Sequence, residues 1–292
     1  MKNRLPVWFK QDLPSQKALD LSDSLRNEFK LNTVCHSAKC PNMPHCFSNR
    51  HATFMILGDT CTRRCGFCNV KKIERGLNRQ LPVDFDEPYR IAQAVKVLNL
   101  EYVVITSVTR DDLDDGGAAH FVNTIRAVRG LNPDIGIEVL IPDFMGLHNA
   151  LESVVKEKPK VISHNLETTS NIFSLVRGEA NYRRSLNLLS NIKSMNPAQV
   201  SKSSIMLGLG EADSDLREAL YDLRSVNCDM LVLGQYLSPS TNHYPVQKFY
   251  SPQEFDNWKD FAYRIGFKDV CAFPLARTSY LSLNKDRQCT IS

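Results

Sequence analysis

From Thr53 onward, the chain alternates short apolar runs with longer segments in which apolar residues recur every three or four positions. The apolar runs are almost uninterrupted, which is typical of parallel strands that are covered on both faces. We therefore predict six strands, at Thr53–Leu57, Tyr102–Ser107, Gly136–Ile141, Val161–His164, Ser204–Leu209 and Met230–Tyr236.

The segments between the strands have the spacing of amphipathic helices, with one apolar stripe that would pack against the sheet. The stripes include Ile91/Val95/Leu98, Phe121/Ile125/Val128 and Leu216/Leu220/Leu223, and a further helix at Glu254–Ile265 follows Pro252. This strict alternation predicts an α/β protein with a parallel sheet, either a partial (β/α)6 barrel or a doubly wound sheet. We favour the partial barrel, because no glycine-rich dinucleotide-binding turn follows the first strand.

The pattern divides the chain into three parts. Residues 1–52 form an irregular N-terminal extension, with one helix at Lys17–Phe29 and then a proline-containing stretch. We interpret this stretch, which carries Cys35, Cys40 and Cys46, as loop. Residues 53–266 form the barrel. Residues 267–292 form a short, irregular C-terminal tail.

Polar residues and glycines follow five consecutive strands. In a parallel α/β barrel the carboxyl ends of the strands form the working surface. Any one of these residues alone would be interpreted as a helix cap or a turn residue, but their recurrence at five strand ends predicts a site. The residues are Thr109, Arg110, Asp111, Asp112, Gly116, Gly117, Asp143, Asn165, Glu167, Gly208, Gly210, Glu211, Gln235, Tyr236 and Ser238.

Composition and charge exclude several classes of function. The net charge of +4 over 292 residues, without a long basic run, argues against nucleic-acid binding. No apolar stretch reaches the roughly 18 residues expected of a membrane span. The first residues lack the apolar core of a secretory signal, so we expect a cytoplasmic protein. In that compartment, clustered cysteines predict metal binding rather than disulfides.

Six of the nine cysteines form two triplets with different spacing. The first triplet is C-x4-C-x5-C and the second is C-x3-C-x2-C, directly after the first strand; their members are Cys35, Cys40 and Cys46, and Cys61, Cys65 and Cys68. Each triplet is one ligand short of the four that usually hold an iron–sulfur cluster. A zinc site that uses His36, His45 or His51 is the alternative, but zinc sites usually pair their ligands as CxxC…CxxC.

The second triplet, at the end of the first strand of a barrel, resembles the signature of the radical S-adenosylmethionine superfamily. Three thiolates hold three irons of a 4Fe–4S cluster there, and the cofactor occupies the fourth iron. The first triplet narrows the resemblance to the lipoyl synthase family. Further matching segments are TCTRRCGFCNV (60–70), TSVTRDDLDDGGA (106–118), SHNLET (163–168), KSSIMLGLGE (202–211), LGQY (233–236) and RTSY (277–280).

The resemblance implies a second, auxiliary 4Fe–4S cluster bound by Cys35, Cys40, Cys46 and the oxygen of Ser279. The N-terminal and C-terminal extensions would then carry this cluster. The family has a serine where this chain has Thr278, which puts in doubt whether the first position could act as the ligand. An alkoxide is an unusually hard ligand for iron, so we expect it to be lost more easily than a thiolate.

The resemblance also implies the reaction and its partners. S-adenosylmethionine would be reduced to a 5′-deoxyadenosyl radical, and two sulfur atoms from the auxiliary cluster would enter the sixth and eighth carbons of a protein-bound octanoyl chain. The expected partners are the glycine cleavage H protein or the lipoyl domains of 2-oxoacid dehydrogenases, and a flavodoxin or ferredoxin as reductant. Candidate contacts to S-adenosylmethionine are Gly116, Gly117, Asn165, Glu167 and Arg177.

Two other functions remain open from the sequence. The first is another sulfur-inserting radical enzyme similar to biotin synthase. The first triplet and the RTSY segment both argue against this alternative. The second is a non-catalytic iron–sulfur or zinc protein, such as an electron carrier. Such a carrier would be expected to complete its ligand sets with four cysteines and would have no need of a large barrel.

Overall fold

The computed structural model describes residues 5–10, 15–38, 40, 42–74 and 80–280. Its central feature is a sheet of seven parallel strands, in which each strand pairs with the next of the seven in chain order. The strands are β1 (His51–Ile56), β4 (Tyr102–Ser107), β5 (Gly136–Leu140), β6 (Val161–Ser163), β7 (Val200–Leu207), β8 (Met230–Gln235) and β9 (Asp269–Ala272).

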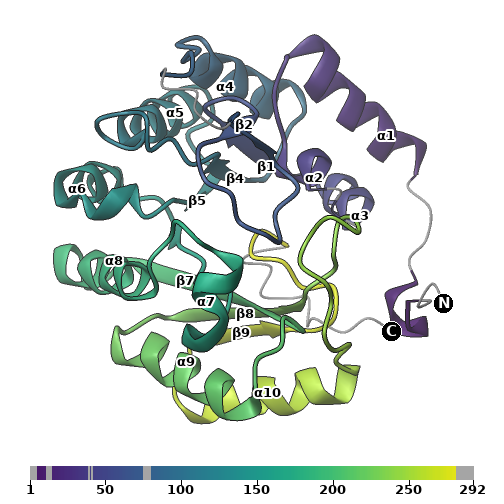
Figure 1. Ribbon diagram of the computed structural model, residues 1–292. Helices are drawn as coiled ribbons and strands as arrows, with labels where there is room; N and C mark the ends of the chain where they lie inside the picture. The colour runs from purple at the N-terminus through teal and green to yellow at the C-terminus, as the bar shows by residue number, and fades with distance from the viewer. Residues whose placement is uncertain (1–4, 11–14, 39, 41, 75–79, 281–292) are drawn as a thin grey trace.

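The strand order decides between the two architectures that the sequence allows. A doubly wound sheet reverses its strand order at an inner strand. Here the order is β1-β4-β5-β6-β7-β8-β9 without a reversal, so each crossover steps in the same direction. The helices therefore lie on the outer side of a curved sheet (Figure 1). The predicted partial barrel is confirmed.

Ten α-helices surround this sheet or precede it in the described residues. The predicted stripes on the helices between strands are confirmed, because Ile91, Phe121 and Leu216, among others, are almost fully buried. The helices are α1 (Gln16–Asp23), α2 (Val34–Ser37), α3 (Met43–Ser48), α4 (Glu87–Val97), α5 (Ala118–Leu131), α6 (His148–Lys156), α7 (Ser170–Val176), α8 (Tyr182–Met195), α9 (Asp213–Ser225) and α10 (Pro252–Arg264). A π-helical turn at Ser24–Glu28 extends α1, and single 3-10 turns lie at Val7–Phe9 and Phe144–Gly146.

Two features of the sheet differ from the prediction. Strand β7 begins at Val200, four residues before the predicted start, because its first half carries buried polar side chains that interrupt the apolar run. Strand β9 is not predicted at all. It has only four residues, of which Asp269 is exposed, so it lacks the apolar run that reveals the other strands. The division into residues 1–52, 53–266 and 267–292 stays a prediction.

The prediction that the first cysteine triplet lies in loop is wrong. Cys35 is in helix α2 and Cys46 is in helix α3, with Cys40 between them. Helix α2 begins after Thr33, whose side-chain oxygen accepts a hydrogen bond from the backbone N–H of His36 at 3.3 Å. Helix α3 carries its proline in the first turn, where the missing N–H is not needed.

No helix in the described parts of the chain combines the length and the apolar character that a membrane span requires.

Candidate functional site

The second cysteine triplet lies on the loop that follows β1 and that a small parallel sheet closes. This sheet pairs β2 (Thr60–Cys61) with β3 (Lys71–Lys72). The Nζ of Lys72 donates hydrogen bonds to the carbonyls of Cys65 and Cys68, at 3.1 and 2.9 Å. The loop is also tied to the end of α7, because the Gly66 N–H donates to the Val176 carbonyl at 2.8 Å. The three cysteines are thus presented by a loop that is anchored at both ends.

The thiols of this triplet are close enough to affect one another electrostatically. Burial, with the neighbouring thiols adding to it, raises the pKa of Cys68 to about 11, and burial raises the pKa of Cys65. A bound cation reverses this effect and holds cysteines as thiolates. The site therefore fits a positively charged iron centre better than three unliganded thiols.

Arg63 fastens the same loop to the ends of two strands. Its side chain is only 5% exposed. It donates two hydrogen bonds to Asp111 after β4, at 2.7 and 2.9 Å, and one to Asp143 after β5, at 2.6 Å. Burial raises the pKa of Asp143, but its hydrogen bond and charge pairing with Arg63 outweigh burial and lower that pKa to about 2. The sequence places both carboxylates at strand ends, and the structure shows that they clamp the cluster loop.

The first triplet lies beside the second. Cys35 is buried, and burial with the neighbouring Cys40 thiol raises its pKa to about 12. The side chain of Asn69, one residue after the second triplet, donates a hydrogen bond to the Ser37 carbonyl at 2.8 Å. Cys46 is buried in α3. The two segments that carry the triplets thus meet in space, as two neighbouring cluster sites require.

The C-terminal RTSY segment, residues 277–280, packs against helix α3, which carries Cys46. The buried Asn42 side chain, between Cys40 and Cys46, donates to the Leu275 carbonyl at 2.6 Å. The Tyr280 hydroxyl lies 2.9 Å from Nδ1 of His45 in α3, and the two rings stack at 5.6 Å. Ser279 is half-buried next to Tyr280. These contacts bring Ser279 to the side of the first triplet.

Among the residues that the structure describes, no group of three or more His, Cys, Asp or Glu side chains is arranged to hold a single ion. In a 4Fe–4S cluster each cysteine binds a different iron, so its sulfur atoms stand farther apart than ligands around one ion. The ligand sets therefore stay predictions.

Three of the predicted contacts to the cofactor come together beside Cys65. Glu167 is held in the left-handed region at φ 73°, and burial raises the pKa of its carboxyl. The Asn165 side chain donates to Glu167 Oε1 at 3.1 Å, and Arg177 donates to the Asn165 carbonyl at 3.0 Å. The charge of Arg177 acts on Cys65, and its buried Nε has no hydrogen-bond partner in the described residues. A buried, unsatisfied guanidinium N–H next to the cluster loop fits an anionic ligand group.

The fold itself explains why Gly116 and Gly117 are glycines. Both have positive φ, 63° and 91°. A Cβ on Gly117 would collide with the Leu57 side chain, and one on Gly116 would lie 3.2 Å from Phe144. Packing alone therefore demands glycine here, and their contact to a cofactor stays a prediction.

Sequence reasoning missed several residues that organise the site. Asn42, Asn69 and Lys72 fasten the two cysteine segments, but none of them follows a strand that the sequence predicts. Burial lowers the pKa of Arg277, and the charges of Cys40 and Glu167, one from each site, act on it in the opposite direction. The RTSY segment is the one signal in the sequence that points to this arginine.

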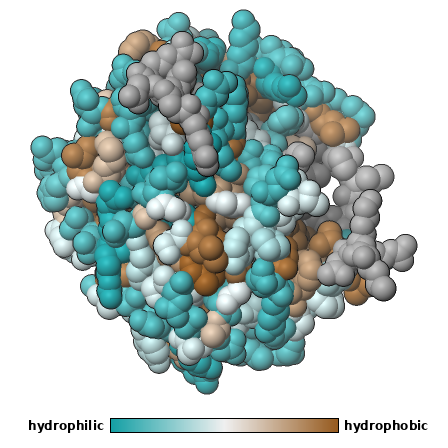
Figure 2. All heavy atoms as spheres, in the orientation of Figure 1, coloured by the Kyte–Doolittle hydropathy of each residue, from teal (hydrophilic) through white to brown (hydrophobic). Residues whose placement is uncertain are grey.

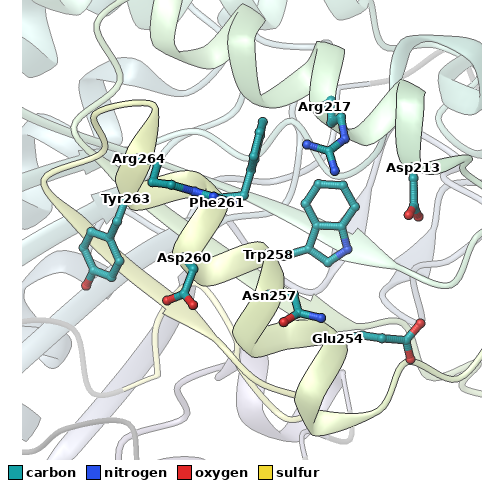
Figure 3. A pocket seen from close by; sticks show the side chains of 9 residues that line it. All are labelled: Asp213, Arg217, Glu254, Asn257, Trp258, Asp260, Phe261, Tyr263 and Arg264. Atoms are coloured by element: carbon teal, nitrogen blue, oxygen red, sulfur yellow. The ribbon is translucent and has the colours of Figure 1, made fainter.

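A surface hollow of about 660 Å³ lies elsewhere, on the outer helices α9 and α10 (Figure 3). Arg217 stacks there over the rings of Trp258 and Phe261, at 5.3 and 4.6 Å. None of the predicted site residues lines it, so it belongs to helix packing and not to the cysteine site.

Comparisons with known proteins show which sequences this chain is similar to. A model of the Radical SAM superfamily matches residues 55–223. The lipoyl synthase of Caldicellulosiruptor saccharolyticus is 48% identical over 282 residues, which cover 97% of each chain. That of Aquifex aeolicus is 52% identical over 256 residues, 88% of this chain and 91% of the relative.

Solved structures share the fold at low identity. Methylornithine synthase superposes with a TM-score of 0.54 at 13% identity, covering 94% of this chain and 86% of its own. The structure of TYW1 with a lysine–pyruvate adduct gives a TM-score of 0.54 at 12% identity, covering 84% and 80%. At these identities the likeness concerns the fold alone.

Proposed function

Because the chain belongs to the lipoyl synthase family of the radical S-adenosylmethionine superfamily, we propose which of its residues carry out that family's reaction. The enzyme is a sulfurtransferase that inserts two sulfur atoms into octanoyl groups attached to carrier proteins. Its cofactors are S-adenosylmethionine and two 4Fe–4S clusters. When bound, these groups supply the electron, the 5′-deoxyadenosyl radical and the sulfur atoms for the sixth and eighth carbons.

Cys61, Cys65 and Cys68 hold the cluster that binds S-adenosylmethionine in this proposal. The single observation that carries it is their place on an anchored loop after β1, beside Asn165, Glu167 and Arg177. Arg177 receives the cofactor's carboxylate, which its unsatisfied Nε supports. Gly116 and Gly117 keep the backbone after β4 close to the methionine moiety.

Cys35, Cys40, Cys46 and Ser279 hold the auxiliary cluster. The contacts of Asn42 with Leu275 and of His45 with Tyr280 support this set, because they seat the C-terminal segment against the helix that carries Cys46.

The octanoyl chain approaches the barrel from the face shown in Figure 2. Apolar side chains gather near the middle of this face, among hydrophilic neighbours. An alkyl chain is stabilised on such a surface, and a site that excludes water protects a radical from side reactions.

We further propose the glycine cleavage H protein and the lipoyl domains of 2-oxoacid dehydrogenases as carriers, and a flavodoxin or ferredoxin as reductant. The family resemblance supports these partners. We also propose a cytoplasmic location, which fits the clustered cysteines because a reducing compartment keeps thiols available for iron.

An anaerobic reaction tests the proposal. The protein is reconstituted with iron and sulfide and given S-adenosylmethionine, a strong reductant and an octanoyl-lysyl peptide, and the peptide is analysed by mass spectrometry. We expect a product in which two hydrogens are replaced by two sulfurs, at no more than about one per enzyme, because the auxiliary cluster is consumed.

Matched cysteine variants assign the two clusters. Cys65→Ala should abolish 5′-deoxyadenosine formation, whereas Cys35→Ala should keep it and lose sulfur insertion. Cys228→Ala is the control, since Cys228 is buried in the core outside both triplets. Sulfur insertion by Cys35→Ala, or radical formation by Cys65→Ala, would contradict these assignments.

A further inference from the structure

Thr278 ties the C-terminal segment to the inside of the barrel. Its side chain is almost buried, and its hydroxyl oxygen lies 3.0 Å from Asn165 Oδ1 and 2.9 Å from Ser204 Oγ. An amide oxygen can only accept, so the Thr278 hydroxyl donates to Asn165 and accepts from Ser204. This fixes the orientation of the Asn165 amide, whose Nδ2 then faces Glu167. A single hydroxyl therefore sets the direction of two predicted cofactor contacts.

The backbone of Thr278 is held by a buried ion pair. Nζ of Lys202 donates to the Thr278 carbonyl at 2.8 Å and lies 2.6 Å from Glu138 Oε1. Glu138 also accepts hydrogen bonds from Tyr102 at 3.1 Å and from Ser163 at 2.9 Å. Buried charges destabilise a fold unless their polar atoms are well satisfied. The Thr278 carbonyl accepts one of the hydrogen bonds that the buried Lys202 ammonium needs. The Lys202–Glu138 ion pair and the C-terminal segment therefore stabilise each other.

Ser279 thus lies between two anchors. Thr278, on one side, is fastened to Asn165, just after the end of β6, and to Ser204 in the middle of β7. Tyr280, on the other side, is fastened to His45 in α3, the helix that carries Cys46. A shift of Thr278 must move Ser279 and release Asn165 at the same time.

We propose that Thr278 is a positioning residue that couples the S-adenosylmethionine site to the auxiliary cluster. Its hydroxyl orients the Asn165 amide toward Glu167, within the proposed cofactor site, and its backbone presents Ser279 to the cluster. Because coupling between two sites is reciprocal, occupation of either site changes the affinity of the other by the same factor. This inference rests on the proposed assignments of Asn165 and Ser279.

The test compares binding of S-adenosylmethionine to anaerobic holoenzyme by equilibrium titration. Thr278→Val keeps the shape and removes the hydroxyl, and we expect about fivefold weaker binding, which corresponds to about 1 kcal/mol. Thr278→Ser restores the hydroxyl and should bind as the wild type does. Thr241→Val is the control, since Thr241 is exposed and outside the site.

A spectroscopic measurement separates coupling from simple structural support. The Mössbauer signal of the auxiliary cluster is recorded with and without S-adenosylmethionine, at matched iron content. We expect the cofactor to change this signal in the wild type and in Thr278→Ser, but not in Thr278→Val. The coupling would be overturned if the cofactor left the wild-type Mössbauer signal unchanged. It would also be overturned if Thr278→Val and the wild type bound S-adenosylmethionine with equal affinity.

A second variant keeps the test decisive if Thr278→Val does not fold. Ser204→Ala removes the donor to Thr278 and leaves Thr278 itself in place, so it should weaken binding in the same direction, and unchanged affinity would contradict the proposal. If wild-type protein forms lipoyl product while both variants bind normally, only the coupling fails. If the wild type binds neither two clusters nor the cofactor, the proposed function fails with it.

Discussion

Individual buried polar side chains in the barrel depend on specific hydrogen-bond partners, and His164 shows this most clearly. Its Nδ1 lies 2.8 Å from the Ile141 carbonyl and its Nε2 lies 2.9 Å from the Ser185 hydroxyl. A carbonyl only accepts, so Nδ1 carries the proton and Nε2 accepts from Ser185. Burial, with the positive charge of Arg177 adding to it, lowers the pKa of His164 to about 4. The imidazole is therefore neutral at pH 7.

This pKa shift predicts a loss of stability in mild acid. The pKa of His164 is about 4 in the folded protein, against an ordinary value of 6.5, so the unfolded chain binds the extra proton first as pH falls. The stability is fully present above about pH 6.5, and about 3 kcal/mol of it is lost by about pH 4. Urea unfolding at a series of pH values measures this slope.

The matched variants for this prediction are His164→Gln and His148→Gln. His164→Gln should flatten the pH dependence in that window, even if the variant is less stable at pH 7. His148 is exposed, so its replacement should leave the slope as in the wild type. An unchanged slope in His164→Gln would show that another group titrates.

At the scale of elements, the loop after β1 depends on the strands beside it. Arg63 joins this loop to the ends of β4 and β5 through Asp111 and Asp143. Asp143 also lies 2.9 Å from Nε of Arg184 in α8, so one carboxylate connects a loop, a strand and a helix. The three elements are therefore expected to move together.

Asp143→Asn should loosen this connection. Removing one partner leaves the buried Arg63 charge less compensated, and we expect a loss of about 3 kcal/mol in the free energy of unfolding. The cluster loop should also release iron faster to a chelator. Asp114→Asn, at an exposed aspartate nearby, is the control. Equal stability and equal iron release in the two variants would rule out the clamp.

At the scale of the whole molecule, the site is assembled from segments that are far apart in the chain. Asn42 and Leu275, which share a hydrogen bond, are 233 positions apart. Helices α2 and α3, the loop after β1 and the C-terminal segment lie side by side at one side of the barrel (Figure 1). Ligand binding at this place should therefore stabilise the complete fold and not only one segment.

S-adenosylmethionine should raise the thermal stability of the holoenzyme. At a cofactor concentration about 100 times Kd, the expected gain is about 2.7 kcal/mol, because only the folded state binds. Cys61→Ala should lose most of this gain, whereas Cys228→Ala should keep it. The midpoint of anaerobic thermal unfolding, with and without cofactor, measures both. A full gain in Cys61→Ala would mean that the cofactor binds away from the second triplet.

The sequence by itself determined the strand–helix alternation and the two cysteine triplets. Those features are local: an apolar run or a short spacing can be recognised within a few residues. The sequence did not predict β9, because this short strand begins with an exposed aspartate. It also did not predict the first half of β7, because a buried ion pair replaces apolar residues there. The helices around Cys35 and Cys46 were not predicted, because each is too short to show the apolar spacing of an amphipathic helix.

Only the tertiary structure decided how these local features meet. The direction of the crossovers, which separates a barrel from a doubly wound sheet, depends on pairing between distant strands. The clamp at Arg63 and the ties of Thr278 join residues whose separation in the chain carries no pattern. Charge pairing and buried hydrogen bonds act through space, so their partners become visible only once the chain is folded.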